Sequence, residues 1–298
     1  MTIVDMATQP FLEFSFMRRA LVGCLALSVS ATPIGVFMIL RRMSLFGEAM
    51  SHAILPGAAI GYLISGLSLV AMTLGGLCAG LIVVVLSGFI SRNTHVKNDA
   101  SLAAFYLMSL ALGVLIISKR GGSIDLLHVL FGSVLALNND ALVLILSIAT
   151  LSLLILSIIY RVLVLESIDP IFLQSVSKKS GAFAHYLFMP LVVLNLVGGF
   201  QALGTLMVVG IMILPSASAF FWSKNLSTII TCAVLFSISS SVVGLVISFY
   251  IDVSSGPAII LTAGSLYMVS LVLGKNGLLR NGKFRYRHAH LYKTSNQP

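Results

Sequence analysis

Hydrophobic residues run along this chain in long, nearly continuous stretches that short polar segments interrupt. Each stretch holds about 20 residues, which is enough for an α-helix to cross the hydrocarbon core of a membrane. None of the polar segments is long enough to fold as a separate soluble domain. The pattern predicts an all-α integral membrane protein with about nine transmembrane helices, at 18–40, 45–65, 67–90, 101–118, 140–164, 184–200, 202–222, 227–250 and 257–274.

One further apolar segment, GSIDLLHVLFGSVL at 122–135, is too short and too polar at its start to cross fully. We interpret it as a re-entrant or interfacial helix. With nine crossings, the N-terminus outside and the C-terminus inside, most of the 18 Lys and Arg residues lie on the cytoplasmic side. The exceptions are Arg18, Arg19, Lys119 and Arg120. This asymmetry is the one that the positive-inside rule predicts, and a crossing at 122–135 would weaken it.

Composition agrees with a single membrane domain. The chain is 58% hydrophobic and 9% charged, far from the roughly 25% charge of soluble domains. We take residues 1–298 as one transmembrane domain, with a membrane core at 15–275 and a basic cytoplasmic tail at 276–298. The net charge of +9 resides in short loops and in this tail. It therefore favours contact with anionic membrane lipid and argues against nucleic acid as a partner.

Two ionisable residues, Glu48 and His52, interrupt the second apolar stretch in the motif GEAMSHAILPG. Ionisable side chains at membrane depth are costly and usually functional. Four residues apart, the two lie on one helix face, and His52 is about 15 Å from Arg42, near the bilayer midplane. Pro56 and Gly57 follow and loosen the helix at the depth where transporters place binding sites. The alternative is a buried pair with a purely structural role.

Ligand chemistry narrows the possible cargo. A carboxylate and an imidazole suit Zn²⁺, Mn²⁺ or Fe²⁺ better than Mg²⁺ or Cu(I). Two ligands are too few for a four-coordinate ion, but a homodimer could bring two copies of Glu48 and His52 together on its two-fold axis. A ligand set without thiolates also permits release. We therefore expect a transported ion and no permanently bound cofactor.

Glycines at close-packing spacing follow this motif. Gly57 and Gly61 are four residues apart, as are Gly76 and Gly80. Such pairs allow helix backbones to approach closely. Helix packing within one subunit is the simplest interpretation of both pairs.

The energy for transport must come from an ion gradient or from a partner protein, because the chain has no GxxxxGK[ST] phosphate-binding loop. The longest polar loop between predicted helices is ESIDPIFLQSVSKKSG at 166–181. Asp169 and Pro170 are typical of a helix start, and the residues up to Gly181 are typical of a stop. A short helix there, parallel to the cytoplasmic face, would suit docking of a soluble ATPase. An ordinary connecting loop is the alternative.

Several motifs, in order, resemble the metal-importing permease subunits of bacterial ABC transporters, the ABC-3 type. They also resemble, more distantly, the vitamin B12 importer permease. The motifs are GVFMILRRMSLFGEAMSHAILPGAAIGY (35–62), LFGSVLAL (130–137), the Asp169–Pro170 loop, LGTLMVVGIMILPSASA (203–219) and SFYIDVSSGPAIIL (248–261). The resemblance implies a fold like that of ABC type II importers and a homodimer in the bacterial inner membrane. It also implies a dimeric cytoplasmic ABC ATPase and an extracytoplasmic metal-binding protein as partners.

The resemblance also assigns residues. The acidic residue and histidine of the family's metal path fall on Glu48 and His52, although the family more often has Asp at the first position. Its coupling segment falls on 166–181, with Asp169, Pro170 and Gly181, at a longer spacing than usual. Pro215 and Ser216 fall in an interrupted span that could flank the pore together with Pro56. Simple packing explains Pro215 and Ser216 equally well.

Rival functions differ in testable ways. An ABC permease for a metal chelate or vitamin-like solute would need a wide cavity and would barely depend on His52. An intramembrane metalloprotease is disfavoured, because the chain lacks HExxH. A gradient-driven carrier would transport without an ATPase. We therefore expect a transport subunit for Zn, Mn or Fe, with ATP hydrolysis in a separate partner.

Overall fold

The computed structural model describes residues 3–66, 68–94, 98–118, 137–168, 173 and 178–278. The regular structure in these ranges is helical, as predicted, because apolar side chains suit a bilayer and a helix satisfies its own backbone groups there. The helices are α1 (Ile3–Glu13), α2 (Ser15–Leu40), α3 (Ser44–Ala53), α4 (Leu55–Ser65), α5 (Leu69–Asn93), α6 (Asn98–Ser118), α8 (Asn139–Ile168), α10 (Lys178–Leu203), α11 (Thr205–Phe220), α12 (Leu226–Ile251) and α13 (Ser255–Leu273).

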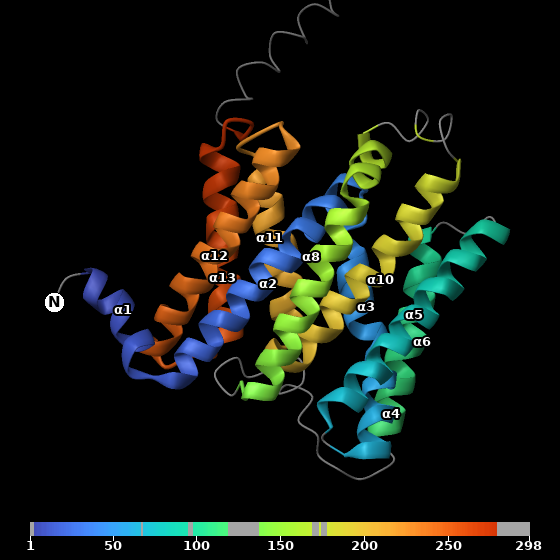
Figure 1. Ribbon diagram of the computed structural model, residues 1–298, viewed down its shortest axis with the longest axis horizontal. Helices are drawn as coiled ribbons and strands as arrows, with labels where there is room; N and C mark the ends of the chain where they lie inside the picture. The colour runs from blue at the N-terminus through green and yellow to red at the C-terminus, as the bar shows by residue number, and fades with distance from the viewer. Residues whose placement is uncertain are drawn as a thin grey trace, which may run out of the picture.

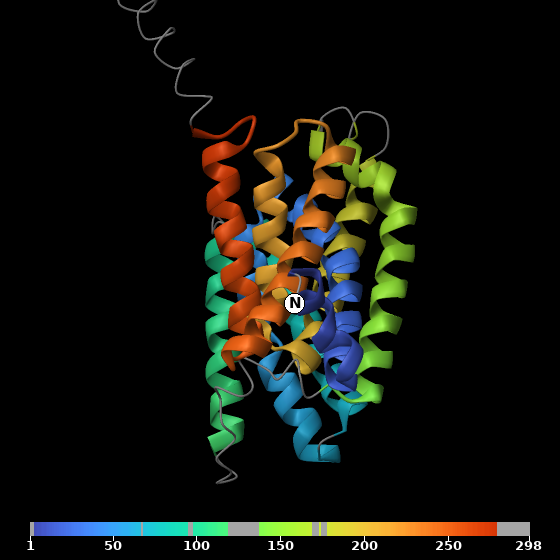
Figure 2. The same ribbon diagram turned by 90° about the vertical axis from the view of Figure 1, so that its left-hand side faces the viewer.

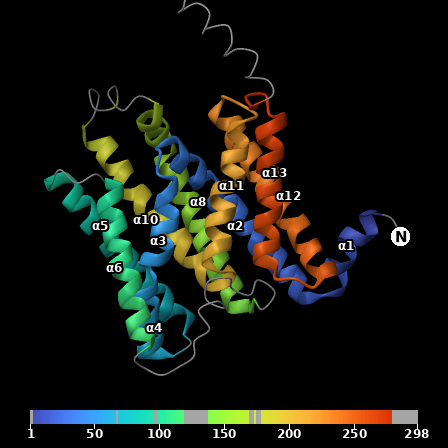
Figure 3. The ribbon, with the colours of Figure 1, turned by 180° about the vertical axis from the view of Figure 1, so that it is seen from behind.

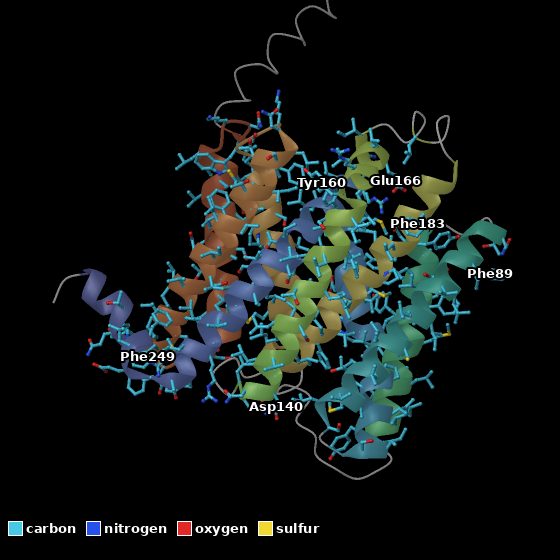
Figure 4. The ribbon with its side chains drawn as sticks, viewed as in Figure 1. Phe89, Asp140, Tyr160, Glu166, Phe183 and Phe249 are labelled. Atoms are coloured by element: carbon cyan, nitrogen blue, oxygen red, sulfur yellow. The ribbon has the colours of Figure 1, made fainter. Side chains whose placement is uncertain are left out.

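Six of the described helices are long and apolar enough to cross a membrane: α2, α5, α6, α8, α12 and α13. The apolar part of α10, Tyr186–Phe200, and helix α11 are shorter. In α2, 72% of the apolar window is buried, whereas the share is 22% in both α5 and α6. The central helix α2 thus lies inside the bundle, and the outer helices present apolar side chains such as Phe89 outward (Figure 4).

The helices are arranged around α2, which runs obliquely through the middle of the molecule (Figure 1). Helices α11, α12 and α13 pack against one another on one side, and α11, α12 and α8 contact α2 directly. On the other side α4 packs against α5 and α6, and α10 contacts both α8 and α5. With α3 and α4 counted together as one segment, successive helices from α2 onward alternate in direction between the two ends of the molecule, as Figure 2 also shows.

The predicted helix positions agree with the structure at each of the nine ranges, with one interruption. The range 45–65 is broken at Ile54 into α3 and α4, with Pro56 in the first turn of α4. The sequence pattern did not indicate the N-terminal helix α1. Residues 178–181, predicted to end a short interfacial helix, instead form the first turn of α10. The segment 122–135, residues Asp169 and Pro170, and the tail from 279 lie outside the described residues.

Glycines bring α4 and α5 into backbone contact, as the spacing of Gly57 and Gly61 predicted. A Cβ atom added to Gly57 would lie on the carbonyl group of Gly75, and one added to Gly75 would lie on that of Gly57. Gly61 similarly faces the carbonyl of Ala71. This GxxxG-like contact fixes α4, and with it the break after α3, against α5.

Candidate functional site

The site begins at the sharp turn between α2 and α3. Helix α2 ends at Leu40, and the N–H of Met43 donates to the carbonyl oxygen of Met38 at 2.8 Å. Arg42 has a φ of 58°, in the left-handed region that a side chain normally disfavours. The chain therefore reverses within three residues and starts α3 at Ser44 against α6 and α10. This reversal places Glu48 on the second turn of α3.

Glu48 lies at a pocket between α3 and the start of α6. The side chain is exposed, and the pocket has a volume of about 220 Å³. Asp99 and Tyr106 of α6 and Arg42 of the turn also line it. The pocket thus holds two carboxylates, one on each helix, and one guanidinium group. A hydrated cation could be attracted here, since the two carboxylates outnumber the single guanidinium group.

His52 lies one turn after Glu48 and is partly buried. Its ring stacks on Tyr106, with the centroids 6.1 Å apart and an interplanar angle of 30°. The Nδ1 atom is buried and has no hydrogen-bond partner among the described residues. Among those residues, His52 forms no ion pair with Glu48 either. The two groups are therefore not a closed structural pair within the described part of the chain.

The break after His52 leaves backbone groups that need other partners. Pro56 has no N–H, so the carbonyl of His52 lacks its usual helical donor four residues ahead. The next carbonyl, that of Ala53, accepts a hydrogen bond from the Ser109 hydroxyl of α6 at 2.8 Å. Figure 3 shows α3 and α4 beside α6, which contacts both. Helix α6 thus supports the bend that carries the two ionisable residues.

The other predicted pore residues lie in a continuous helix. Helix α11 passes through Pro215 without a break, and both Pro215 and Ser216 are buried. The Ser216 hydroxyl donates to the carbonyls of Met212 at 2.7 Å and Thr32 at 3.0 Å. These bonds tie α11 to α2, which favours the packing interpretation of Ser216. Pro56 is also buried, at the start of α4.

A buried ion pair lies near the predicted coupling segment. Arg41, directly after α2, pairs with Glu166. Figure 4 shows Glu166 near the end of α8. The exposed fractions of the two side chains are 8% and 20%. The Arg41 guanidinium also lies over the Phe188 ring of α10, 4.9 Å from its centroid. The pair therefore joins the turn before α3 to the two helices that flank 169–177. Gly181 lies in the first turn of α10.

The sequence pattern did not indicate Asp99, Tyr106 or the Arg41–Glu166 pair as part of a site. Asp99 and Tyr106 are seven residues apart and so share one face of a helix, which is the signal that could have linked them. Among the described residues, no three His, Cys, Asp or Glu side chains lie close enough together to hold one metal ion. Within those residues, one chain does not complete a metal site.

Comparisons with known proteins place the chain in a family. The sequence model described as the ABC 3 transport family matches residues 13–274. The manganese import system permease protein ScaB of Streptococcus gordonii is 34% identical, over 88% of this chain and 92% of that protein. The manganese transport system membrane protein MntC of Halalkalibacterium halodurans is 34% identical, over 90% and 91%. The chelated iron transport system membrane protein YfeD of Yersinia pestis is 28% identical, over 91% and 89%.

A solved structure agrees with these relatives. The structure of PsaBC from Streptococcus pneumoniae in complex with Fab matches with a TM-score of 0.81 and 31% sequence identity. The match covers 92% of this chain and 97% of that chain. The chain therefore belongs to the ABC 3 transport family, as the multi-pass inner-membrane permease subunit of a metal-ion ABC importer whose ATPase is a separate subunit.

Proposed function

We propose that Glu48 and His52 are transient ligands for the divalent metal ion that this permease carries. In a homodimer, two copies of each residue would meet on the two-fold axis and form a site with two carboxylates and two imidazoles. Such a site would bind the ion beside the break between α3 and α4 and would hold it only transiently. The relatives named for manganese or chelated iron support a first-row divalent ion as cargo.

One observation carries this proposal. An exposed carboxylate and an imidazole whose buried Nδ1 atom has no hydrogen-bond partner among the described residues lie one turn apart, directly before a helix break. A buried polar atom without a partner costs roughly 1–3 kcal/mol, so its retention calls for a reason. A function for the imidazole supplies that reason, and cation binding is the function that the neighbouring Glu48 carboxylate favours.

Manganese is the cargo that we favour, followed by iron and then zinc. Two curated relatives that match about nine tenths of this chain are named for manganese. Mixed oxygen and nitrogen ligands are compatible with all three ions. The exposed Asp99 carboxylate beside Glu48 adds a further oxygen donor near the path, which favours the harder manganese ion over zinc.

We propose further that the chain crosses the membrane nine times, with α3 and α4 together forming one broken crossing. The carboxyl ends of α2, α5, α8, α11 and α13 lie at the same end of the molecule (Figures 1 and 3). Arg41 and Arg42 directly follow α2, and Lys224 and Lys275 lie in the segments just after α11 and α13. This end would be cytoplasmic by the positive-inside rule, which puts the N-terminus outside.

The partners follow from this orientation. A dimeric cytoplasmic ATPase would dock at the coupling segment 166–181, and a metal-binding protein would deliver the ion at the opposite face. The Arg41–Glu166 pair supports this arrangement, because it connects the start of the coupling segment to the turn before α3. A movement of that segment could therefore be transmitted to the metal ligands through few intervening residues.

Uptake by the reconstituted importer tests the proposal. Proteoliposomes with the permease, its ATPase and its binding protein would be assayed for uptake of radiolabelled manganese. We expect His52→Ala and Glu48→Gln to lower uptake at limiting metal by about 100-fold, since each removes a ligand from both subunits. Glu13→Gln, the same change at an exposed position on α1, serves as the control. Wild-type uptake by His52→Ala would contradict the proposal.

A second candidate is transport of a metal chelate, which the name of the Yersinia pestis relative favours. A chelate is held by the walls of a wide cavity and not by ligands that displace its own donors. The pocket beside Glu48 has a volume of about 220 Å³, below the roughly 300–1,000 Å³ of pockets for drug-sized molecules. Under this alternative, His52→Ala would leave uptake of the chelate nearly unchanged.

A further inference from the structure

The imidazole of His52 is in an unusual position for a metal ligand. Histidines that bind metals almost always use their second ring nitrogen to donate a hydrogen bond that fixes the ring orientation. Here Nδ1 is buried and has no hydrogen-bond partner among the described residues. Some other contact must therefore hold the ring if it is to meet an ion in one geometry.

Tyr106 makes that contact. Its ring stacks on the imidazole at a centroid distance of 6.1 Å and an angle of 30°. Tyr106 is itself partly buried against the hydrophobic core of the bundle, so its own position is restrained. It also lines the pocket beside Glu48. Tyr106 thus contacts the His52 ring and also lines the pocket beside Glu48.

Two further turns of α6 fix the backbone that follows His52. Ser109, three residues after Tyr106, is buried and donates to the carbonyl of Ala53 at 2.8 Å. Gly113, one turn later, lies so close to Leu55 and Pro56 that an added Cβ would lie 3.2 Å from the Pro56 nitrogen. Residues spaced by three and four share one helix face. One face of α6 therefore follows the bend from His52 to Pro56.

We propose that Tyr106 and Ser109 are positioning residues for the metal ligand His52. Tyr106 restricts rotation of the imidazole ring, and Ser109 restricts the backbone of the helical turn from which the ring projects. The inference rests on the proposed function, because it gives a role to these residues only if His52 binds the ion. It adds two residues of α6, neither of which is itself a proposed ligand.

The expected effect is a loss of affinity for the ion. Replacing groups that orient a metal ligand typically weakens metal binding by about 10–100-fold. We expect Tyr106→Leu and Tyr106→Met to raise the KM for uptake by this factor, and Tyr106→Phe to retain the wild-type KM. Ser109→Ala should raise the KM about tenfold or less, and Ser109→Thr, which keeps the hydroxyl, should restore it.

Metal preference distinguishes positioning from packing. Imidazole is a more important donor for zinc than for manganese, so a misplaced His52 ring should raise the KM for zinc more than that for manganese. A purely structural role would lower the amount of folded transporter, and hence the maximal rate, for both ions equally. The two KM values, the maximal rate and the amount of folded transporter are therefore measured together in proteoliposomes. Folded transporter is quantified by size-exclusion chromatography.

The matched control is Tyr267→Leu, which removes a ring that packs against Phe221 at 5.7 Å, away from His52. Its KM values should equal those of the wild type. Unchanged KM values in the Tyr106 variants, or a loss confined to the maximal rate, would overturn the inference. If His52→Ala loses uptake while Tyr106→Leu and Ser109→Ala keep wild-type KM values, only this inference fails. If His52→Ala itself transports normally, the proposed function fails.

Discussion

At the scale of single residues, the two members of the ionisable pair have different surroundings. Glu48 is exposed at a pocket that it shares with Asp99, whereas His52 is partly buried against Tyr106. A carboxylate in contact with solvent can receive a hydrated cation, and a half-buried imidazole can bind it after some of its water is lost. The pair therefore suits a site that must both capture and release an ion.

Shortening the acidic side chain tests how strict the geometry is. Glu48→Asp keeps the charge and the donor type, and the family more often has Asp at this position. We expect a change in the KM for manganese of less than about tenfold, against about 100-fold for Glu48→Gln, which loses the charge. Uptake in proteoliposomes measures both. Equal KM values for Gln and Glu would show that the carboxylate is not a ligand.

The residues that could be predicted from sequence are those that contrast with their neighbours. Glu48 and His52 are evident because charge is rare in an apolar stretch, and Pro56 is evident because it breaks a helix. Tyr106 and Ser109 have no such contrast, since Tyr and Ser are ordinary residues in a membrane helix. Their role depends on α6 lying beside α3, which is a long-range contact that hydrophobic periodicity does not encode.

At the scale of helices, backbone contacts through glycine hold the broken helix in place. Gly57 of α4 and Gly75 of α5 each leave no room for a Cβ atom, and Gly35 of α2 meets the carbonyl of Met212 in the same way. Gly88 and Gly264, in contrast, have open space at the Cβ position. Glycine is thus required at some of these positions and replaceable at others.

These differences predict opposite effects of one substitution. Gly57→Ala would force α4 and α5 apart and should destabilise the protein by about 1–3 kcal/mol. Gly88→Ala and Gly264→Ala should be neutral or stabilising by up to about 1 kcal/mol, because Ala favours the helix and meets no neighbour. Thermal unfolding in detergent measures the shifts. A Gly57→Ala variant as stable as Gly264→Ala would contradict the backbone contact.

The Arg41–Glu166 pair makes a second prediction at this scale. Removing one partner leaves the other charge partly buried, so Arg41→Ala and Glu166→Ala should each destabilise the protein by about 1–3 kcal/mol. The double variant leaves no unpaired charge and should lose less than the sum of the two. A double-mutant cycle of unfolding midpoints tests this. Additive losses would mean that the two side chains do not interact.

At the scale of the whole molecule, helix positions follow from sequence because the membrane fixes the length of an apolar helix. The predicted ranges and the observed helices agree for this reason. The prediction that a short helix ends at 178–181 was wrong. The Lys and Gly residues there are typical of a helix end, but they form the first turn of α10. Sequence also does not show how α2 lies in the centre of the bundle or which helices cover it.

At the same scale, the metal path that we propose calls for two copies of the chain. No group of three metal-binding side chains exists in the part of the chain that the structure describes. Two ligands from one subunit hold a divalent ion weakly, and four ligands from two subunits can hold it long enough to transport it. The metal path that we propose is therefore a property of the assembled dimer.

The most direct test is the position of manganese in the assembled permease and ATPase complex, measured by anomalous diffraction from crystals soaked in Mn²⁺. We expect one peak on the two-fold axis, about 2.0–2.6 Å from the carboxylate oxygens of both Glu48 residues and from the imidazoles of both His52 residues. A peak bound by other residues, or a dimer in which these four groups point away from the axis, would contradict the proposed path.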